Sequence, residues 1–349
     1  MPTAMRHIYP CMIFMLLSLS LAGCDATVHE YPYEVTPPTE LIVELSDDRG
    51  EMEHYREINY IRASGRSVAA GVTRAGFMPE CYYPDDDYCL RFTVELYDDN
   101  SPQAIVDRRT VYGEIGSRPP QSSVGFNVTA GQYTVVAWSD YVLRADGSDL
   151  VYDVSDLRAL HRTELAVDNN YAKEAFTAAK EVTIAPNYRK EPELRTVEME
   201  LTRPQGLYRI ATTDLEAFLA SGRTLDDIEI EVTYRQYVSL GYDALTQSPN
   251  MFEPTRTYTS VPRAIIKDSQ TLALLAWDYV LVNNTETNVL VDIAVRDKGG
   301  KVIARTTDIL IPLMRNKETL VTGEFLTTSF GEGGIVIDDK FPDEIKIDI

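Results

Sequence analysis

The sequence predicts an all-β protein built from two related domains, and two observations lead to this fold class. Segments 90–97 and 228–234 alternate apolar and polar residues, and a period of two is typical of a strand with one buried face. Segments 131–142 and 272–280 each contain an apolar run, then Ala-Trp, then Asp-Tyr-Val, and they hold the only two tryptophans. The two copies are about 140 residues apart, roughly one domain length. We expect each domain to be built around one copy; chance similarity between two aromatic strands is the alternative.

The overall composition limits the classes of protein to which the chain can belong. The 349 residues are 44% hydrophobic and 25% charged, which is ordinary for a globular chain long enough for two domains. The formal net charge of −21 argues against nucleic acid as a partner, because binding phosphates needs clustered lysine and arginine. We interpret the acidic balance as a source of solubility.

The N-terminus predicts a lipoprotein signal peptide over residues 1–23. Arg6 precedes an apolar run at 12–21, which is too short for a transmembrane helix and typical of a secretory signal. Leu21-Ala22-Gly23-Cys24 resembles a bacterial lipobox, in which cleavage precedes the cysteine and its thiol receives acyl chains such as palmitate. Several acyl chains on Cys24 would hold the protein on a membrane, with 24–38 as a proline-containing spacer. A secretory signal with an incidental cysteine is the alternative.

Cys81 and Cys89 predict a disulfide. They bracket a short acidic stretch, and an even pair this close most simply forms a bond outside the cytoplasm. A metal site would need further ligands, and no nearby histidine supplies them. Residues 85–87 are three aspartates without the alternating spacing of a calcium loop, so we interpret them as a solvated turn and predict no metal site.

The sequence contains no recognisable catalytic constellation. The four histidines, His7, His29, His54 and His161, belong to no metal or hydrolase motif, and there is no phosphate-binding glycine loop. We therefore predict that the protein is not an enzyme, has no cofactor and takes no small-molecule substrate. A carboxylate pair for glycoside hydrolysis is the alternative that sequence alone leaves open.

The predicted first domain covers 39–202. Alternation and β-forming residues predict strands at 40–45, 90–97, 104–112, 124–128, 131–142, 182–184 and 197–201. Segment 49–80 has weak periodicity and is expected to mix a strand with irregular chain. Segment 170–176 is expected to form a short helical turn or a loop. Arg203-Pro204 marks the domain boundary.

The predicted second domain covers 203–330 and opens with a strand and one short helix. Thr213 and Glu216 form a capping box, and Gly222 ends the helix. Leu215, Phe218 and Leu219 give the helix an apolar side. Strands are expected at 207–211, 228–234, 272–280, 309–313 and 320–326, with a hairpin over 289–305 and a loop at 241–254.

Residues 331–349 form a C-terminal tail. Ile345, Ile347 and Ile349 share one face of an extended strand, and Gly333-Gly334 provides a hinge before them. One interpretation is that the tail exchanges with a neighbouring molecule. The alternative is that it folds back as an edge strand of its own domain.

These motifs resemble, in their order along the chain, the Bacteroidetes fimbrillin superfamily, and within it the lipoprotein anchor branch of type V pili. The resemblance rests on 133–141, on 202–210, on 311–323, on the glycine-punctuated tail and on the lipobox. It implies two transthyretin-like β-sandwich domains in tandem. It also implies an outer-membrane lipoprotein, exposed at the cell surface, whose partners are other fimbrial subunits and whose assembly proceeds by strand exchange.

The resemblance leaves the type of subunit open. Stalk subunits of such pili are trimmed after an arginine in the N-terminal domain, and Arg49, Arg56, Arg62 and Arg66 are candidates by residue type. Trimming would make the chain a stalk or tip subunit, whereas an anchor subunit is expected to keep its lipid. A surface adhesin or glycan-binding lipoprotein, with ligand contacts from Tyr82, Tyr83 and Tyr88, is the alternative function.

Overall fold

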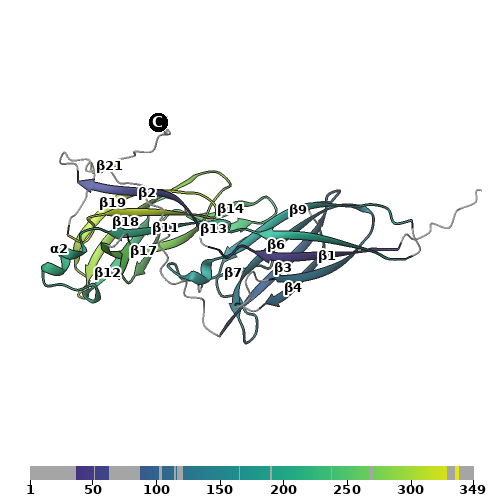
Figure 1. Ribbon diagram of the computed structural model, residues 1–349, viewed down its shortest axis with the longest axis horizontal. Helices are drawn as coiled ribbons and strands as arrows, with labels where there is room; N and C mark the ends of the chain where they lie inside the picture. Colours follow the sequence, from purple (N-terminus) through teal and green to yellow (C-terminus); the bar gives the residue numbers. More distant parts are fainter. Residues whose placement is uncertain are drawn as a thin grey trace, which may run out of the picture.

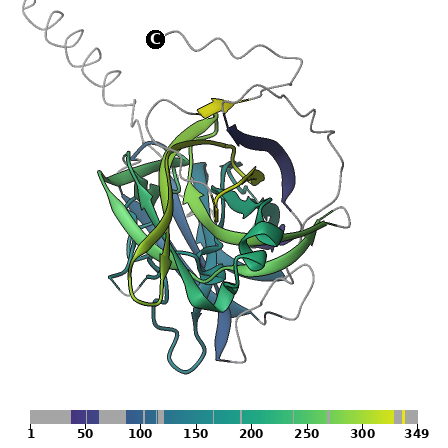
Figure 2. The same ribbon diagram turned by 90° about the vertical axis from the view of Figure 1, so that its left-hand side faces the viewer.

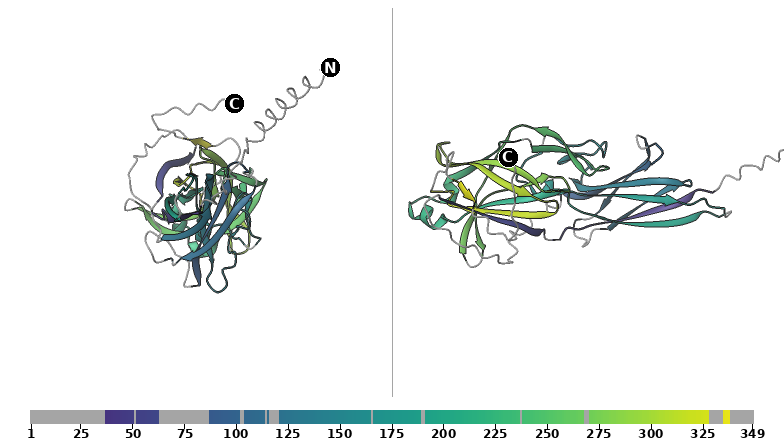
Figure 3. Two further views of the ribbon diagram at one scale, coloured as in Figure 1. Left: turned by 90° about the vertical axis from the view of Figure 1, so that its right-hand side faces the viewer. Right: turned by 90° about the horizontal axis from the view of Figure 1, so that it is seen from above.

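The computed structural model is almost entirely β-structure. It describes residues 37–50, 52–62, 87–101, 104–113, 115, 121–164, 166–188, 191–236, 238–267, 270–327 and 335–337. Within these residues one α-helix and two 3₁₀ turns accompany the strands β1 to β21. The predicted all-β class is confirmed. Two layered bodies lie end to end along the long axis (Figures 1 and 3).

The first body is a sandwich of a three-stranded and a four-stranded sheet. One sheet has the order β10-β1-β5 and the other the order β4-β3-β6-β9. The strands are β1 (Thr39–Asp47), β3 (Tyr88–Asp98), β4 (Ile105–Gly113), β5 (Gln121–Val128), β6 (Gly131–Leu143), β9 (Phe176–Ile184) and β10 (Glu193–Leu201). β1 is the central strand of its sheet, parallel to β10 and antiparallel to β5. Its alternate residues Leu41, Val43 and Leu45 enter the core, as the apolar period of 40–45 predicted.

The second body pairs a six-stranded with a four-stranded sheet. Their orders are β16-β17-β11-β20-β2-β21 and β15-β12-β18-β19. The first contains β2 (Glu53–Arg62), β11 (Gln205–Thr212), β16 (Arg263–Lys267), β17 (Gln270–Leu281), β20 (Lys317–Gly323) and β21 (Ile335–Ile337). The second contains β12 (Ile228–Tyr234), β15 (Arg256–Ser260), β18 (Thr287–Asp297) and β19 (Val302–Leu313). The predicted hairpin over 289–305 is β18 and β19, and β19 continues through the strand predicted at 309–313.

The two tryptophan-containing segments are internal strands of their sheets. β6 lies between β3 and β9, and β17 lies between β16 and β11. Trp138 is fully buried and packs against the rings of Tyr152 and Tyr242. Trp277 belongs to a separate small cluster and stacks on Tyr171. Each segment is therefore central to one sandwich, while the two indoles have different surroundings.

Strand β2 joins the second sandwich although it lies within residues 39–202 of the predicted first domain. It runs parallel to β20, with Ile58 opposite Val321 and Tyr60 opposite Gly323. β1 and β2 follow one another along the long axis without a reversal of the chain (Figure 1). The first two strands thus tie the sandwiches together, a long-range arrangement that local periodicity does not encode.

A small third sheet spans the two bodies. It has the order β14-β13-β8-β7, formed by β7 (Tyr152–Asp153), β8 (Leu160–Arg162), β13 (Val238–Asp243) and β14 (Ser248–Glu253). The loop predicted at 241–254 was wrong, because β13 and β14 form a hairpin there and β13 pairs with β8. Tyr242 of this hairpin is fully buried in the core cluster of the first sandwich. A side chain at Gly241 would collide with Asn250 and with the Leu160 carbonyl oxygen, so this close pairing requires glycine.

The predicted helix is α2 (Leu215–Ala220), and its capping differs from the prediction. Asp214, not Thr213, occupies the N-cap position, and its side chain makes no cap bond. The Asp214 carboxylate instead accepts hydrogen bonds from the backbone of Leu326 and Thr327. Gly222 follows the helix with φ +83°, the left-handed conformation that glycine favours. Leu215 and Phe218 are buried, whereas Leu219 is 46% exposed.

Candidate assembly site

Most residues predicted to carry function lie outside the described residues. They are the lipid site Cys24, the disulfide partner Cys81, and Ile345, Ile347 and Ile349 of the exchanged strand. Lipid attachment, the disulfide and exchange through these isoleucines therefore stay predictions. Cys89 is described: it lies in β3, is 7% exposed, and borders a surface hollow that Tyr112 and Arg144 also line.

The described part of the C-terminal tail, β21, lies on the second sandwich of its own chain. It pairs antiparallel with the end of β2, with Ile337 opposite Tyr60, Val336 opposite Ile61 and Ile335 opposite Arg62. Viewed down the long axis, β2 forms the rim of the sandwich and the short β21 lies beside it (Figure 2). These three residues of the tail therefore form an edge strand of their own domain, which is the alternative that the sequence left open.

Among the described residues, only the end of β2 has a strand on both sides. β20 covers one side of β2, and β21 covers only its last three residues on the other. From Glu53 to Asn59 the structure describes no strand on that second side. Ile58 and Tyr60 point into the core, and the Tyr60 hydroxyl donates to the Leu310 carbonyl oxygen at 3.2 Å. A strand held by β20 on one side, with a described strand along only its last three residues on the other, has the geometry to accept another extended segment.

Arg49, the first of the four arginines considered for trimming, is buried where the chain passes from β1 to β2. Its guanidinium donates to the Asp47 carboxylate at 2.7 Å and to the Tyr141 hydroxyl at 2.7 Å. The side chain is 6% exposed and also lies 3.5 Å from Glu174. Burial disfavours its charge, but Tyr141, Asp47 and Glu174 outweigh that cost and raise the pKa of Arg49 further. This arginine is therefore a permanently charged structural residue.

A second arginine, Arg203, binds the same connection between β1 and β2. Arg203 donates to Glu174 at 2.7 Å and to the backbone oxygen of Gly50 at 2.9 Å. The guanidinium groups of Arg49 and Arg203 both lie over the ring of Phe176, at 4.4 and 4.8 Å from its centroid. These cation–π contacts and charge-assisted hydrogen bonds hold residues 48–50 against both sandwiches.

The other candidate arginines are less enclosed or outside the described part. Arg56 is half-buried and pairs with Glu286 at 2.9 Å, and the Tyr55 hydroxyl donates to the same carboxylate. The side chain of Arg62 and the whole of Arg66 lie outside the described residues. Arg49 thus lies in the connection between β1 and β2 and Arg56 lies within β2, and the structure assigns neither as a cleavage site.

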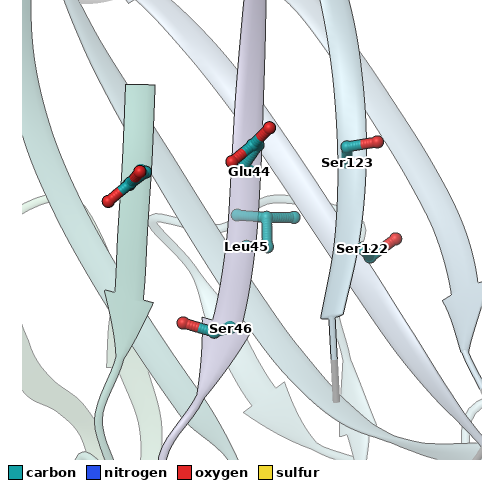
Figure 4. Close-up of a pocket in the computed structure, with 6 residues that line it drawn as sticks. Glu44, Leu45, Ser46, Ser122 and Ser123 are labelled. Carbon is teal, nitrogen blue, oxygen red and sulfur yellow. The ribbon is translucent and has the colours of Figure 1, made fainter. Parts of the chain in front are cut away.

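The outer face of the β10-β1-β5 sheet carries a shallow acidic hollow (Figure 4). Glu44 of β1 lies opposite Ser123 of β5 and opposite Glu198 of β10. Ser46 and Ser122 complete its polar lining. None of the described residues that line the hollow is aromatic, so they offer no ring on which a sugar could stack.

The described residues contain neither a metal-binding cluster nor a membrane-spanning helix. No group of three or more histidine, cysteine or carboxylate side chains there is arranged to hold a metal ion. Across the same ranges, no helix has the length and apolar character needed to cross a membrane.

Together these features define an all-β protein of two joined sandwiches, in which a short strand of the C-terminal tail pairs with the end of β2. The chain belongs to DUF6562, a family of unknown function, whose model matches residues 57–349. No curated protein matches the chain.

Several solved structures are similar at low identity. A candidate polysaccharide-binding protein from Bacteroides thetaiotaomicron is 13% identical with a TM-score of 0.43, and the match covers 76% of this chain and 79% of that one. The fimbrial anchor protein Mfa2 from Porphyromonas gingivalis is 12% identical with a TM-score of 0.40, covering 78% and 82%. A candidate adhesin from Bacteroides ovatus is 12% identical with a TM-score of 0.40, covering 77% of each chain. At these TM-scores the similarity carries no argument about function.

Proposed function

We propose that this protein is an outer-membrane lipoprotein that anchors a fimbrial assembly and binds neighbouring subunits by β-strand exchange. The proposal assigns it no enzymatic activity and no cofactor. It takes the sandwiches to be transthyretin-like domains that lie mainly within 39–202 and 203–330, with β2 as part of the second. The observation that carries it is the position of β21, a three-residue strand of the C-terminal tail that pairs with the end of β2.

The short pairing of β21 supports exchange on energetic grounds. A backbone hydrogen bond contributes only about 0.5–1.5 kcal/mol net, so a three-residue strand is weakly held. A longer strand from a neighbouring subunit would pair with β2 from Glu53 onward and gain more bonds than β21 gives up. The same tail, once released, is free to pair with the next subunit.

The buried connection between β1 and β2 supports an anchor rather than a trimmed subunit. Cleavage after Arg49 would remove β1, the central strand of its sheet, together with the buried Leu41, Val43 and Leu45. A protease would also need an extended, accessible chain at a position where Arg49 is enclosed by Asp47, Tyr141 and Glu174. A chain that keeps β1 keeps its connection to Cys24 and the membrane.

A disulfide between β2 and β21 tests the exchange. Ile61 and Val336 lie directly opposite each other, so the double variant Ile61→Cys/Val336→Cys should tie the tail to its own chain. We expect cells carrying it to lose assembled fimbriae under oxidising conditions and to regain them after mild reduction. The two single-cysteine variants are the matched controls and should assemble normally. Normal assembly by the oxidised, cross-linked double variant would contradict exchange through this edge.

Replacement of the lipid site tests the membrane anchor separately. Cys24→Ala should move the protein from the membrane fraction to the soluble fraction after a carbonate wash, and fimbriae should be shed from cells. Cys24→Ser is a second variant that also lacks a thiol for acylation. Retention of either variant in the washed membranes would rule out anchoring through Cys24.

A further inference from the structure

A buried ion pair connects the two sandwiches. Lys173 ends the 3₁₀ turn η1 (Tyr171–Lys173), which precedes β9 of the first sandwich. Its ammonium donates to both carboxylate oxygens of Asp278, at 2.6 and 2.7 Å. Asp278 lies in β17 of the second sandwich, and both side chains are almost completely buried, 4% and 1% exposed.

Local structure fixes the position of the lysine. The side chain of Asn170 caps η1 by accepting from the backbone of Ala172. The backbone oxygen of Lys173 accepts from the Tyr152 hydroxyl at 2.8 Å and from the Gln205 amide at 2.7 Å. These hydrogen bonds fix the backbone of Lys173, so the range of positions that its ammonium can reach is small.

A second carboxylate extends the pair into a cluster. Asp168 accepts from Lys173 at 3.0 Å, from Arg162 at 2.6 Å and from Arg256 at 2.6 Å. Arg162 belongs to β8 and Arg256 to β15, so the cluster again reaches both bodies.

The remaining acceptor sites on Asp278 are also used. The Tyr234 hydroxyl donates to one carboxylate oxygen at 2.8 Å. The backbone N–H of Asn169 donates to the other at 3.1 Å. Asp278 therefore accepts from Lys173 of η1 and from the segment before η1, and these two contacts require the two sandwiches in one orientation. The third donor, Tyr234 of β12, belongs to the same sandwich as Asp278 and completes its hydrogen bonding.

We propose that Lys173 and Asp278 form an orientation lock, which makes the two sandwiches one body that unfolds in a single step. A buried ion pair gains little net stability, because both charges lose their hydration. Any displaced docking geometry, however, leaves a buried charge without its partner, and that is strongly unfavourable. The pair thus selects one arrangement of the sandwiches over the alternatives. This inference concerns the purified chain and does not depend on the proposed function.

The test is calorimetry of the full mature chain with a set of charge-removing variants. The wild type should give one unfolding transition. Lys173→Met leaves Asp278 buried and unpaired, and it should lower Tm by about 5–10 °C. Lys173→Met/Asp278→Asn removes both charges while keeping an acceptor for Tyr234, and it should recover at least half of that loss. Arg296→Met, which breaks a partly exposed surface pair with Glu231, is the control and should change Tm by about 2 °C or less.

Hydrogen exchange provides the readout of orientation. In Lys173→Met, backbone amides of β8, β13 and η1 should exchange faster than in the wild type, while those of β12 and β18 should not. Two separate wild-type transitions, or a Lys173→Met effect no larger than that of Arg296→Met, would overturn the proposal. If Lys173→Met does not fold, the double variant decides: a folded double variant supports the lock, and an unfolded one contradicts it.

Discussion

The ring of Tyr171 stacks on the indole of Trp277, with centroids 4.1 Å apart and 28° between the planes. Tyr171 belongs to η1 beside the first sandwich, and Trp277 lies in β17 of the second. Aromatic pairs of this kind add about 0.5–1.5 kcal/mol beyond the area that they bury. The contact places an aromatic side chain of one body on the sheet of the other, next to the Lys173–Asp278 pair.

Tyr171→Ala is expected to weaken this junction. The change removes the stacked ring and leaves a cavity beside Trp277, so the free energy of unfolding should fall by about 1–3 kcal/mol. The indole should also become more hydrated, which shifts tryptophan emission to longer wavelength. Denaturant unfolding followed by fluorescence measures both effects. Tyr188→Ala is the control, because Tyr188 is 86% exposed; an equal loss in both variants would contradict the prediction.

Gly241→Ala is expected to disrupt the small sheet between the sandwiches. The added methyl group would lie 2.6 Å from the Leu160 carbonyl oxygen and 3.1 Å from the Met251 side chain. Overpacking against backbone costs about 1–3 kcal/mol, and here it separates β13 from β8. Gly300→Ala is the comparison: it has φ +80° but open space around it, so only the backbone cost of about 1 kcal/mol applies. Chemical denaturation should show the larger loss for Gly241→Ala.

The contribution of Asp168 to the stability of the fold should decrease as the pH is lowered. Burial opposes its charge, yet Lys173, Arg162 and Arg256 outweigh that effect and lower the pKa of Asp168 below its usual value. A lowered pKa gives stability that is complete above the unfolded value of about 3.9 and is lost as the pH falls toward the folded value. The Tm difference between wild type and Asp168→Asn should therefore be constant above about pH 5 and shrink below about pH 4.

Thermal melts between pH 3 and pH 8 measure this difference. Asp226→Asn, at an exposed aspartate, is the matched control and should show little difference from wild type at any pH. A Tm difference between wild type and Asp168→Asn that increases on acidification would contradict the predicted direction of the pKa shift.

The cysteine pair makes a prediction that mass spectrometry can check. If Cys81 and Cys89 are joined, alkylation of the unfolded but unreduced protein should leave both unlabelled, and prior reduction should add two labels. Closing such a short loop should stabilise the fold by about 2–3 kcal/mol in the chain-entropy model. Labelling of both thiols without reductant would exclude the bond.

The sequence correctly predicted strands in which the alternation of apolar and polar residues reflects burial against a single core. Segment 228–234 was predicted to the residue, because its alternate side chains all face the second core. The predicted loop at 241–254 is instead part of the hairpin of β13 with β14, and β13 also pairs with β8, far away in the chain. Serine, proline and asparagine in β14 are typical of turns, and no local pattern reveals pairing across bodies.

The functional residues were harder to predict for a related reason. Lys173 and Asp278 are 105 residues apart, and neither belongs to a motif. One signal was present: Asp278 interrupts the apolar run of 272–280, and a charge inside such a strand requires a buried partner. Asp140 in the other tryptophan segment follows the same rule, with Arg91 as its partner at 2.7 Å. Sequence alone does not identify which cation fills that role.

The central place of β1 has a mechanical consequence. All nine residues of β1 pair with β10 on one side, and most pair with β5 on the other. The strand runs along the long axis of the molecule, with its start at the end that leads to the N-terminus (Figure 1). Tension between a membrane tether at that end and a partner on β2 would pull β1 parallel to its neighbours. The hydrogen bonds of β1 lie across the direction of this force, so all of them would resist it at the same time. A strand that is pulled away from one end, in contrast, loses its hydrogen bonds one after another.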